Sequence, residues 1–254
     1  MTAFKAAYSN ELSKLRHRKK YLVFLIIGLA ICAIWAGLVS VVSMFMGEFG
    51  GWFVGFVPTA MGVLPFFLQF LLPLLIFMAA TDLITTEGAE ATMKGCVCRP
   101  VARWKLFAGK LLAIMTYVAF YLACIFVLST VLNQILGGHM SAGLNDVFAA
   151  LASYALTLPP LAVLAAFAAL IALIGRSPSL TMLLLIGIYA AMHILPVVFP
   201  IFSEMLFTSY LSWHRMWIGI LPSAGRLLHM SAILLGYGVV FLIIGSLIFE
   251  KKEY

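Results

Sequence analysis

Residues 21–46 read YLVFLIIGLAICAIWAGLVSVVSMFM, a run without a single Asp, Glu, Lys or Arg. A helix needs about 20 apolar residues to cross the roughly 30 Å hydrocarbon core of a bilayer. One charged side chain at the centre of such a helix costs about 2.5–3.5 kcal/mol on insertion scales. This uncharged run therefore predicts a membrane-spanning helix.

The same pattern recurs five more times along the 254-residue chain. The chain is 64% hydrophobic and 10% charged, whereas a soluble domain is about 25% charged. The polar stretches between the apolar runs are too short to form a core of their own. The sequence predicts an all-α integral membrane protein, a single domain over residues 1–254. Its further spans are Thr59–Ala80, Leu111–Leu132, Val147–Ile174, Leu180–Phe202 and Met230–Phe249.

The positive charges are distributed unevenly between the two sides of the predicted membrane. Fourteen of the sixteen Lys and Arg residues lie before the first span, in alternate loops or after the last span, and only Arg215 and Arg226 lie opposite. Cytoplasmic loops of membrane proteins carry such an excess. We expect a multi-pass protein of the plasma membrane with both termini in the cytoplasm. Its basic surface would face anionic lipid headgroups and cytosolic partners rather than nucleic acid.

The N-terminal segment, residues 1–20, combines basic residues with a regular apolar pattern. Its apolar residues recur at intervals of three and four, which places them on one helical face. The pattern predicts an amphipathic helix in the cytoplasmic interface; the alternative is a disordered basic tail. The apolar residues are Phe4, Ala7, Tyr8, Leu12 and Leu15.

The opposite side carries one unusual segment, residues 203–229. It contains Tyr210, Trp213 and Trp217 and is too polar for two spans but too apolar for a free loop. Trp and Tyr concentrate at membrane interfaces. We expect a pair of short re-entrant or interfacial helices before the last span.

Prolines interrupt two of the predicted spans. Pro65 and Pro73 lie in the second span, and Pro159 and Pro160 lie in the fourth. Proline removes a backbone donor and kinks a helix. Membrane helices tolerate this where neighbours satisfy the freed carbonyl, so we expect kinks that are supported by other elements.

The loop after the second span reads TDLITTEGAEATMKGCVCRPVARWKLFAGK over residues 81–110. Acidic residues come first and basic residues follow, an order that suits the helix dipole. We expect a short helix here that lies across the inner mouth of the bundle.

This loop resembles that of the permeases of type-2 ABC exporters, which have six spans and cytoplasmic termini. The shared pattern is an acidic helix after the second span followed by basic motifs that lead into the third span. The chain departs from it at Ala91, where the family often has Gly. The N-terminal helix, the outer segment and the tail from Phe249 to Glu253 also match, so the resemblance covers the whole chain. The loop residues that carry it are Asp82, Glu87, Thr92, Lys94, Pro100, Val101, Arg103, Gly109 and Lys110.

The resemblance implies a permease subunit whose ATPase is a separate cytosolic protein. Two ATPase copies would bind ATP and Mg, and a second permease, identical or paralogous, would complete the transporter. The sequence contains no G-x-x-x-x-G-K-[ST] phosphate loop. The coupling segment would be residues 81–105, with Glu87, exposed to water, as its main contact. The residues expected to couple to the ATPase are Asp82, Glu87, Glu90, Thr92, Lys94 and Arg103.

Other functions remain open from the residues alone. A six-span vitamin-capture subunit of an importer would have the same number of spans. An intramembrane enzyme would need ionisable residues inside spans, where only His193 occurs, with Gln69 as a polar companion. The apolar spans favour a hydrophobic or amphipathic cargo, such as an antimicrobial peptide, a lipid-linked molecule or a drug.

Overall fold

The computed structural model describes residues 3–53, 59–89, 103–136, 144–216 and 224–251. Within these residues the chain is helical throughout and has no strand. Six of its helices are long and apolar enough to span a membrane, which confirms the predicted number. They cover Lys19–Val42, Ala60–Thr86, Trp104–Leu136, Leu144–Ile174, Pro178–Val198 and Gly225–Lys251.

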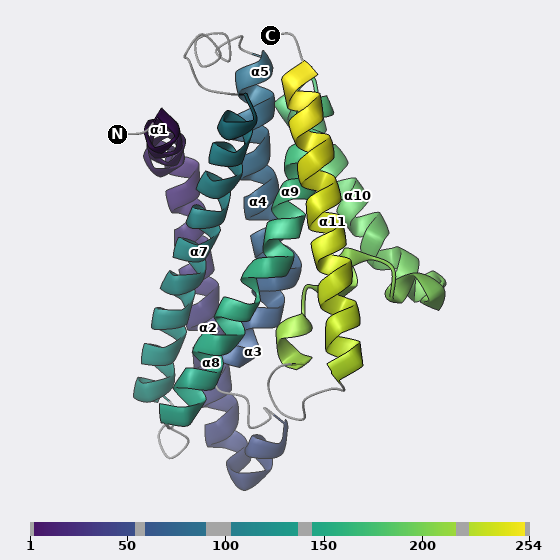
Figure 1. The fold of residues 1–254 in the computed structure, drawn as a ribbon. Coiled ribbons are helices and arrows are strands. Elements are labelled where there is room, and N and C mark those ends of the chain that lie inside the picture. Colours follow the sequence, from purple (N-terminus) through teal and green to yellow (C-terminus); the bar gives the residue numbers. More distant parts are fainter. Residues whose placement is uncertain (1–2, 54–58, 90–102, 137–143, 217–223, 252–254) are drawn as a thin grey trace.

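The long helices run side by side, and one short helix crosses them (Figure 1). Helix α1 (Ala3–His17) lies across the end of the bundle and packs on α7 (Arg103–Leu136). Helix α2 (Lys19–Phe53) begins beside it, and α11 (Ala224–Lys251) finishes at the same end. We call this end the α1 end. The first and last described helices share it, as an even number of spans requires.

The second span is one continuous helical column with two wide, π-helical stretches. It comprises α3 (Thr59–Phe66), η1 (Phe67–Leu71), α4 (Leu72–Ala80), η2 (Thr81–Thr86) and α5 (Glu87–Ala89). Thr86 Oγ1 donates to the carbonyl of Thr81, five residues back, at 3.2 Å. Residues 81–89 thus prolong the span, and the expectation of a separate helix across the inner mouth is wrong for them. The hydroxyl groups of Thr81 and Thr86 bond to carbonyls of the same helical column.

The fourth span breaks where its prolines predict. Helix α8 (Leu144–Leu156) ends, Thr157 forms a turn, and α9 (Leu158–Ile174) begins with the two prolines in its first turn. Pro160 has no N–H to donate to the carbonyl of Leu156. That carbonyl instead accepts a hydrogen bond from the indole Nε1–H of Trp213.

The same compensation occurs in the second span. In a regular helix the Gln69 carbonyl would accept from residue 73, which is a proline. The hydroxyl group of Tyr189, on α10 (Pro178–Val198), donates to this carbonyl at 3.0 Å. A side chain from another element thus meets a carbonyl at the proline, as membrane helices require.

The fifth span ends earlier than predicted, at Val198. Phe199 is extended, with φ −128° and ψ 94°, because it precedes Pro200. Three short 3₁₀ helices follow: η4 (Pro200–Ser203), η5 (Phe207–Tyr210) and η6 (Trp213–Met216). Within the described part of the outer segment, η5 and η6 are two short helices that precede the last span, as expected, although they are 3₁₀ helices, and residues 224–229 belong to α11. Their re-entrant or interfacial placement stays a prediction.

The core lies around the second and fourth spans. In the most apolar stretch of each, 67% of the residues are buried, against 11% in α10 and 17% in α2 and α11. Helices α4, α9 and α7 pack against one another there. Helices α2 and α7 approach closely at Gly28, where an added Cβ would lie 1.9 Å from the Tyr121 hydroxyl.

Candidate functional site

Charged side chains from three distant parts of the sequence form a closed ring at the α1 end. Lys14 Nζ lies 2.9 Å from a Glu11 carboxylate oxygen and 2.6 Å from one of Glu87. Lys110 Nζ contacts the other oxygens of the same two carboxylates, at 3.1 Å and 2.7 Å. We call Glu11, Lys14, Glu87 and Lys110 the ion ring. It ties α1 to α5 and to the start of the third span.

Lys110 is the most deeply placed member of the ion ring. It is only 2% exposed. Besides the two carboxylates, its ammonium group donates to the backbone carbonyl of Leu83 at 2.8 Å. Its three N–H donors thus have three acceptors, which is the condition for burying a lysine at tolerable cost.

Asp82 forms a second centre beside the ring. Arg18 lies 3.1 Å from its carboxylate and Lys20 lies 2.5 Å from it. The hydroxyl group of Tyr21 donates to it at 2.7 Å. The junction between α1 and α2 is thereby attached to the second span.

Hydrogen bonds connect these charged centres to the rest of the bundle. Thr85 Oγ1 donates to the carbonyl of Ala172 in α9 at 2.8 Å. The hydroxyl group of Tyr117 in α7 donates to the carbonyl of Tyr21 at 3.0 Å. A displacement of α1 or α5 would therefore act on the second, third and fourth spans together.

The pKa values of Glu87 and Lys14 are shifted in opposite directions by the ring. Burial opposes ionisation of Glu87, but the ammonium groups of Lys110 and Lys14 outweigh it and hold the pKa of Glu87 below its usual value. Burial likewise opposes protonation of Lys14, but its hydrogen bonds to Glu87 and Glu11 raise the pKa of Lys14 above its usual value. The two opposite shifts favour the ion-paired form.

The expectation that Glu87 is exposed to water is wrong. Glu87 is 6% exposed, and Asp82 is equally buried. The reason is that α5 continues the second span, so its acidic side chains meet α1 and α7 instead of leaving the bundle. Both residues lie in the site, but as internal ion-pair partners.

The remaining expected coupling residues are not tested by the described structure. Glu90, Thr92 and Lys94 lie outside the described residues. Arg103 is the first residue of α7. The expectation for these four residues stays a prediction.

Sequence reasoning missed most of the partners of Asp82 and Glu87. Arg18, Lys20 and Lys110 were assigned to the lipid surface as part of the positive excess. One signal was available: Glu11 is the sole acid among residues 1–20 and lies on the same helical face as Tyr8 and Leu15. An acid on the apolar face of a basic helix indicates a buried partner.

The described residues contain no group of three or more His, Cys, Asp and Glu side chains that could hold a metal ion. Cys96 and Cys98 lie outside the described residues. Within the described part, the site's chemistry is that of ion pairing and hydrogen bonding.

The fold and site define a polytopic helical membrane protein whose short N-terminal helix, α1, is joined by ion pairs to its second and third spans. Residues 8–192 match the family model for the ABC-2 family transporter protein. The match runs from α1 into α10 and includes the whole ion ring. The chain therefore belongs to the ABC-2 family of transporters and is a membrane permease, a transport component without a catalytic domain. No curated protein matches the chain closely.

Proposed function

We propose that this permease couples ATP hydrolysis by a separate cytosolic ATPase to the outward movement of a hydrophobic or amphipathic cargo. The observation that carries the proposal is the ion ring. It joins the crossing helix, the end of the second span and the start of the third span into one unit. ABC-2 permeases generally pair with ATPase subunits, and this unit lies at the end where we place the cytoplasm.

The direction of insertion follows from charge. The Lys and Arg excess belongs to the α1 end, and Arg215 and Arg226 belong to the other. Placing the excess in the cytoplasm puts the ion ring and both termini on the ATPase side. Labelling of single cysteines introduced in intact cells tests this: a reagent that cannot cross the membrane should reach position 226 but not position 5.

In this proposal the ATPase contacts the exposed side of α1 and the segment after α5, while the ion ring transmits the movement. Asp82 and Glu87 then act from inside, without contact with the ATPase, because both are buried. Glu90, Thr92, Lys94 and Arg103 keep their expected place in the coupling segment. Two ATPase copies would supply bound ATP and Mg to a pair of permeases, identical or paralogous.

The cargo is proposed on the character of the spans. The exposed faces of α2, α10 and α11 are almost wholly apolar, with Leu22, Leu183 and Leu235 each more than half exposed. Lipid or a second permease would cover them. A transporter built in this way suits a cargo taken from the membrane, such as an antimicrobial peptide, and resistance to such peptides is the role we propose.

Lys14→Gln tests the coupling, with Lys5→Gln as its matched control on the same helix. Lys14 bridges both acids of the ion ring, whereas Lys5 is exposed. Vesicles containing permease and ATPase should lose cargo-stimulated ATP hydrolysis and transport with Lys14→Gln and keep both with Lys5→Gln. The partner ATPase should still bind the variant.

The proposal has two clear points of failure. Full transport by Lys14→Gln at equal abundance would show that the ring does not transmit movement. Uphill cargo transport by the permease alone, driven by a proton or sodium gradient, would overturn the ATP-driven exporter itself.

A further inference from the structure

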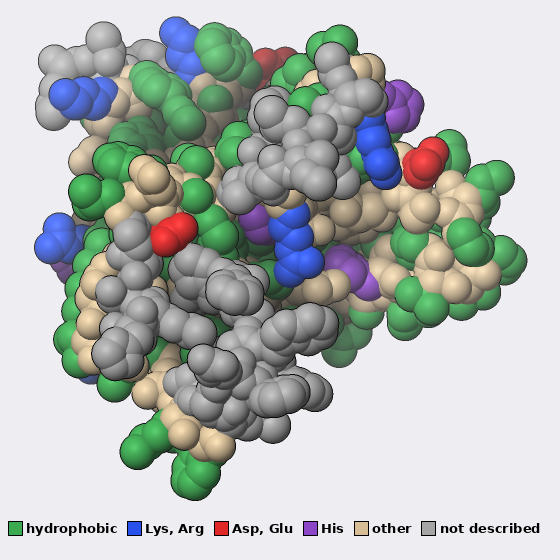
Figure 2. Space-filling model, turned by 90° about the horizontal axis from the view of Figure 1, so that it is seen from below, with side chains coloured by type: hydrophobic (Ala, Val, Ile, Leu, Met, Phe, Trp, Pro, Cys, Tyr) green, Lys and Arg blue, Asp and Glu red, His purple; other side chains and the backbone are tan. Residues whose placement is uncertain are grey.

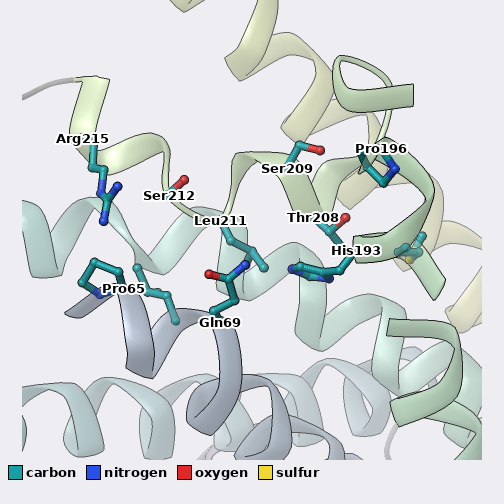
Figure 3. A pocket seen from close by; sticks show the side chains of 11 residues that line it. Pro65, Gln69, His193, Pro196, Thr208, Ser209, Leu211, Ser212 and Arg215 are labelled. Atoms are coloured by element: carbon teal, nitrogen blue, oxygen red, sulfur yellow. The ribbon is translucent and has the colours of Figure 1, made fainter. Parts of the chain in front are cut away.

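A cavity of about 220 Å³ lies far from the ion ring, between the second span, α10 and the 3₁₀ helices η5 and η6. Figure 3 shows its side chains converging from these three elements. Gln69 precedes Asp82 by thirteen residues, or about 20 Å of helix. The cavity thus lies towards the opposite membrane surface. Its polar lining residues are Gln69, His193, Thr208, Ser209, Ser212 and Arg215.

The polar lining is unusual for its depth. Gln69 and His193 lie in spans that contain no charged residue at this level, and the Gln69 side chain is exposed. Hydrocarbon cannot satisfy an amide or an imidazole, so such groups face water, protein or a polar ligand. The shared cavity places His193 and Gln69 together in one polar lining.

The cavity has a positive charge and no negative one. Among the described residues, Arg215 is the only formally charged one in the lining, and no Asp or Glu of that part of the chain lines the cavity. Arg215 makes no salt bridge with a carboxylate of the described residues. The neighbouring His214 adds no charge, because burial, and then the charge of Arg215, lowers the pKa of His214 to about 4. Figure 2 looks onto the end of the bundle opposite the α1 end and shows Lys/Arg and His side chains near the middle of that face.

The hydrogen-bonding groups suit an oxyanion. The lining includes groups that can donate to an oxyanion: the Arg215 guanidinium, the Gln69 amide and three hydroxyl groups. The His193 ring is held by its Nδ1 atom, which lies 3.0 Å from the carbonyl of Tyr189. A carbonyl oxygen only accepts, so Nδ1 is the donor and Nε2 stays available for a further partner. In Figure 3, Gln69 lies between Arg215 and His193.

The volume of the cavity suits a lipid headgroup better than a whole drug-sized molecule. Ligand pockets for whole drug-sized molecules occupy about 300–1,000 Å³, more than this cavity offers. A phosphate or carboxylate with a few neighbouring atoms fits. Beside it, α10 presents exposed apolar side chains, among them Ile194 at 60% and Val197 at 81%. Acyl chains would lie there while the headgroup occupies the cavity.

We propose that this cavity binds the anionic headgroup of a membrane amphipath, through a phosphate or carboxylate held by Arg215, Gln69 and His193. The site is built from spans two and five together with the outer segment, so occupancy fixes these three elements relative to one another. The inference does not depend on the coupling proposed for the ion ring, and binding can be measured without an ATPase.

Calorimetric titration of the purified permease in neutral detergent tests the site. The probes are dihexanoyl phosphatidylglycerol, dihexanoyl phosphatidylcholine and inorganic phosphate. We expect the anionic lipid to bind more tightly than the zwitterionic one. Arg215→Gln should weaken its binding at least tenfold, and Gln69→Leu should weaken it less. Arg226→Gln, an exposed arginine on α11 outside the cavity lining, serves as the control and should not change it.

The results of this titration distinguish a lipid headgroup from a free anion as the ligand of the cavity. Competition by inorganic phosphate as strong as that of the lipid would support the oxyanion site and assign it to a free anion. Equal binding of the two lipids would overturn the proposal. So would unchanged binding in both Arg215→Gln and Gln69→Leu, provided that their thermal midpoints match the wild type.

Discussion

Removing the Lys110 ammonium group should destabilise the permease far more than removing that of Lys20. Lys110 contacts two carboxylates, the closer at 2.7 Å, and is 2% exposed. At an effective dielectric constant of about 20, a pair at this separation attracts by about 6 kcal/mol before desolvation is counted. Breaking a buried pair from one side costs about 3–5 kcal/mol, because a charge stays buried without its partner. We expect that loss for Lys110→Met.

Lys20→Met is the matched control. If the distance between the paired atoms alone decided the cost, Lys20→Met would be the more destabilising variant. Lys20 Nζ is 2.5 Å from Asp82, yet its side chain is 44% exposed and Arg18 stays beside the same carboxylate. Exposed pairs contribute about 0–1 kcal/mol. Comparing the two variants therefore tests whether burial or interatomic distance determines how much an ion pair at the α1 end stabilises the protein.

Equilibrium unfolding in mixed detergent micelles, followed by far-ultraviolet circular dichroism, measures both variants. A double-mutant cycle with Glu87→Gln then isolates the Lys110–Glu87 pair. We expect a coupling energy above about 1.5 kcal/mol, within the range for residues in one network. Equal losses for Lys110→Met and Lys20→Met, or a negligible coupling energy, would refute the reasoning. If Lys110→Met does not fold, Glu87→Gln alone gives the comparison with Lys20→Met.

Three further predictions follow from particular contacts. Because the folded-state pKa of Glu87 is lowered, its stabilisation is present above about pH 4.3 and is lost as pH falls through the folded value. The stability difference between wild type and Glu87→Gln should therefore shrink below that pH in thermal unfolding, and a constant difference would contradict the ring. Gly28→Ala should cost about 1–3 kcal/mol because its Cβ meets Tyr121, whereas Gly37→Ala, with open space around it, should cost little; equal unfolding midpoints would count against the close helix contact. Tyr189→Phe removes the donor to the carbonyl at the second-span proline and should cost about 1–3 kcal/mol in the same assay; a neutral result would mean that another group satisfies this carbonyl.

The membrane spans were predictable because the hydrocarbon core of a bilayer disfavours a charged side chain at any position within it. Charged residues are excluded over a fixed length, so a run such as residues 21–46 can be recognised as a span without knowing which elements pack against it. The break at Thr157 was predictable for a similar reason, since proline acts on its own helix. The early end of α10 at Val198 follows from Pro200, and the effect of a proline on the preceding residue could have indicated it.

The ion ring was not predictable in the same way. Glu87 pairs with Lys14 and Lys110, which lie 73 and 23 residues away. Nothing in the local pattern distinguishes these lysines from those that meet lipid headgroups or water. The general expectation that a loop carboxylate is hydrated failed at Glu87, because the loop's first residues are part of a buried helix.

The π-helical stretches in the second span also set the direction in which its acidic residues point. In an α-helix one residue corresponds to about 100° of rotation around the axis. A wide turn accommodates an additional residue, so everything beyond it is reoriented relative to everything before it. The azimuth of Glu87, the direction in which its side chain leaves the helix axis, is thus set by η2, which ends at the preceding residue, Thr86. Conversion of η2 to regular α-helix would turn Glu87 by roughly a quarter of a circle, away from both lysines. Such a rotation would remove the Glu87 links between the second span and α1, while the contact of Glu11 with Lys110 does not involve Glu87.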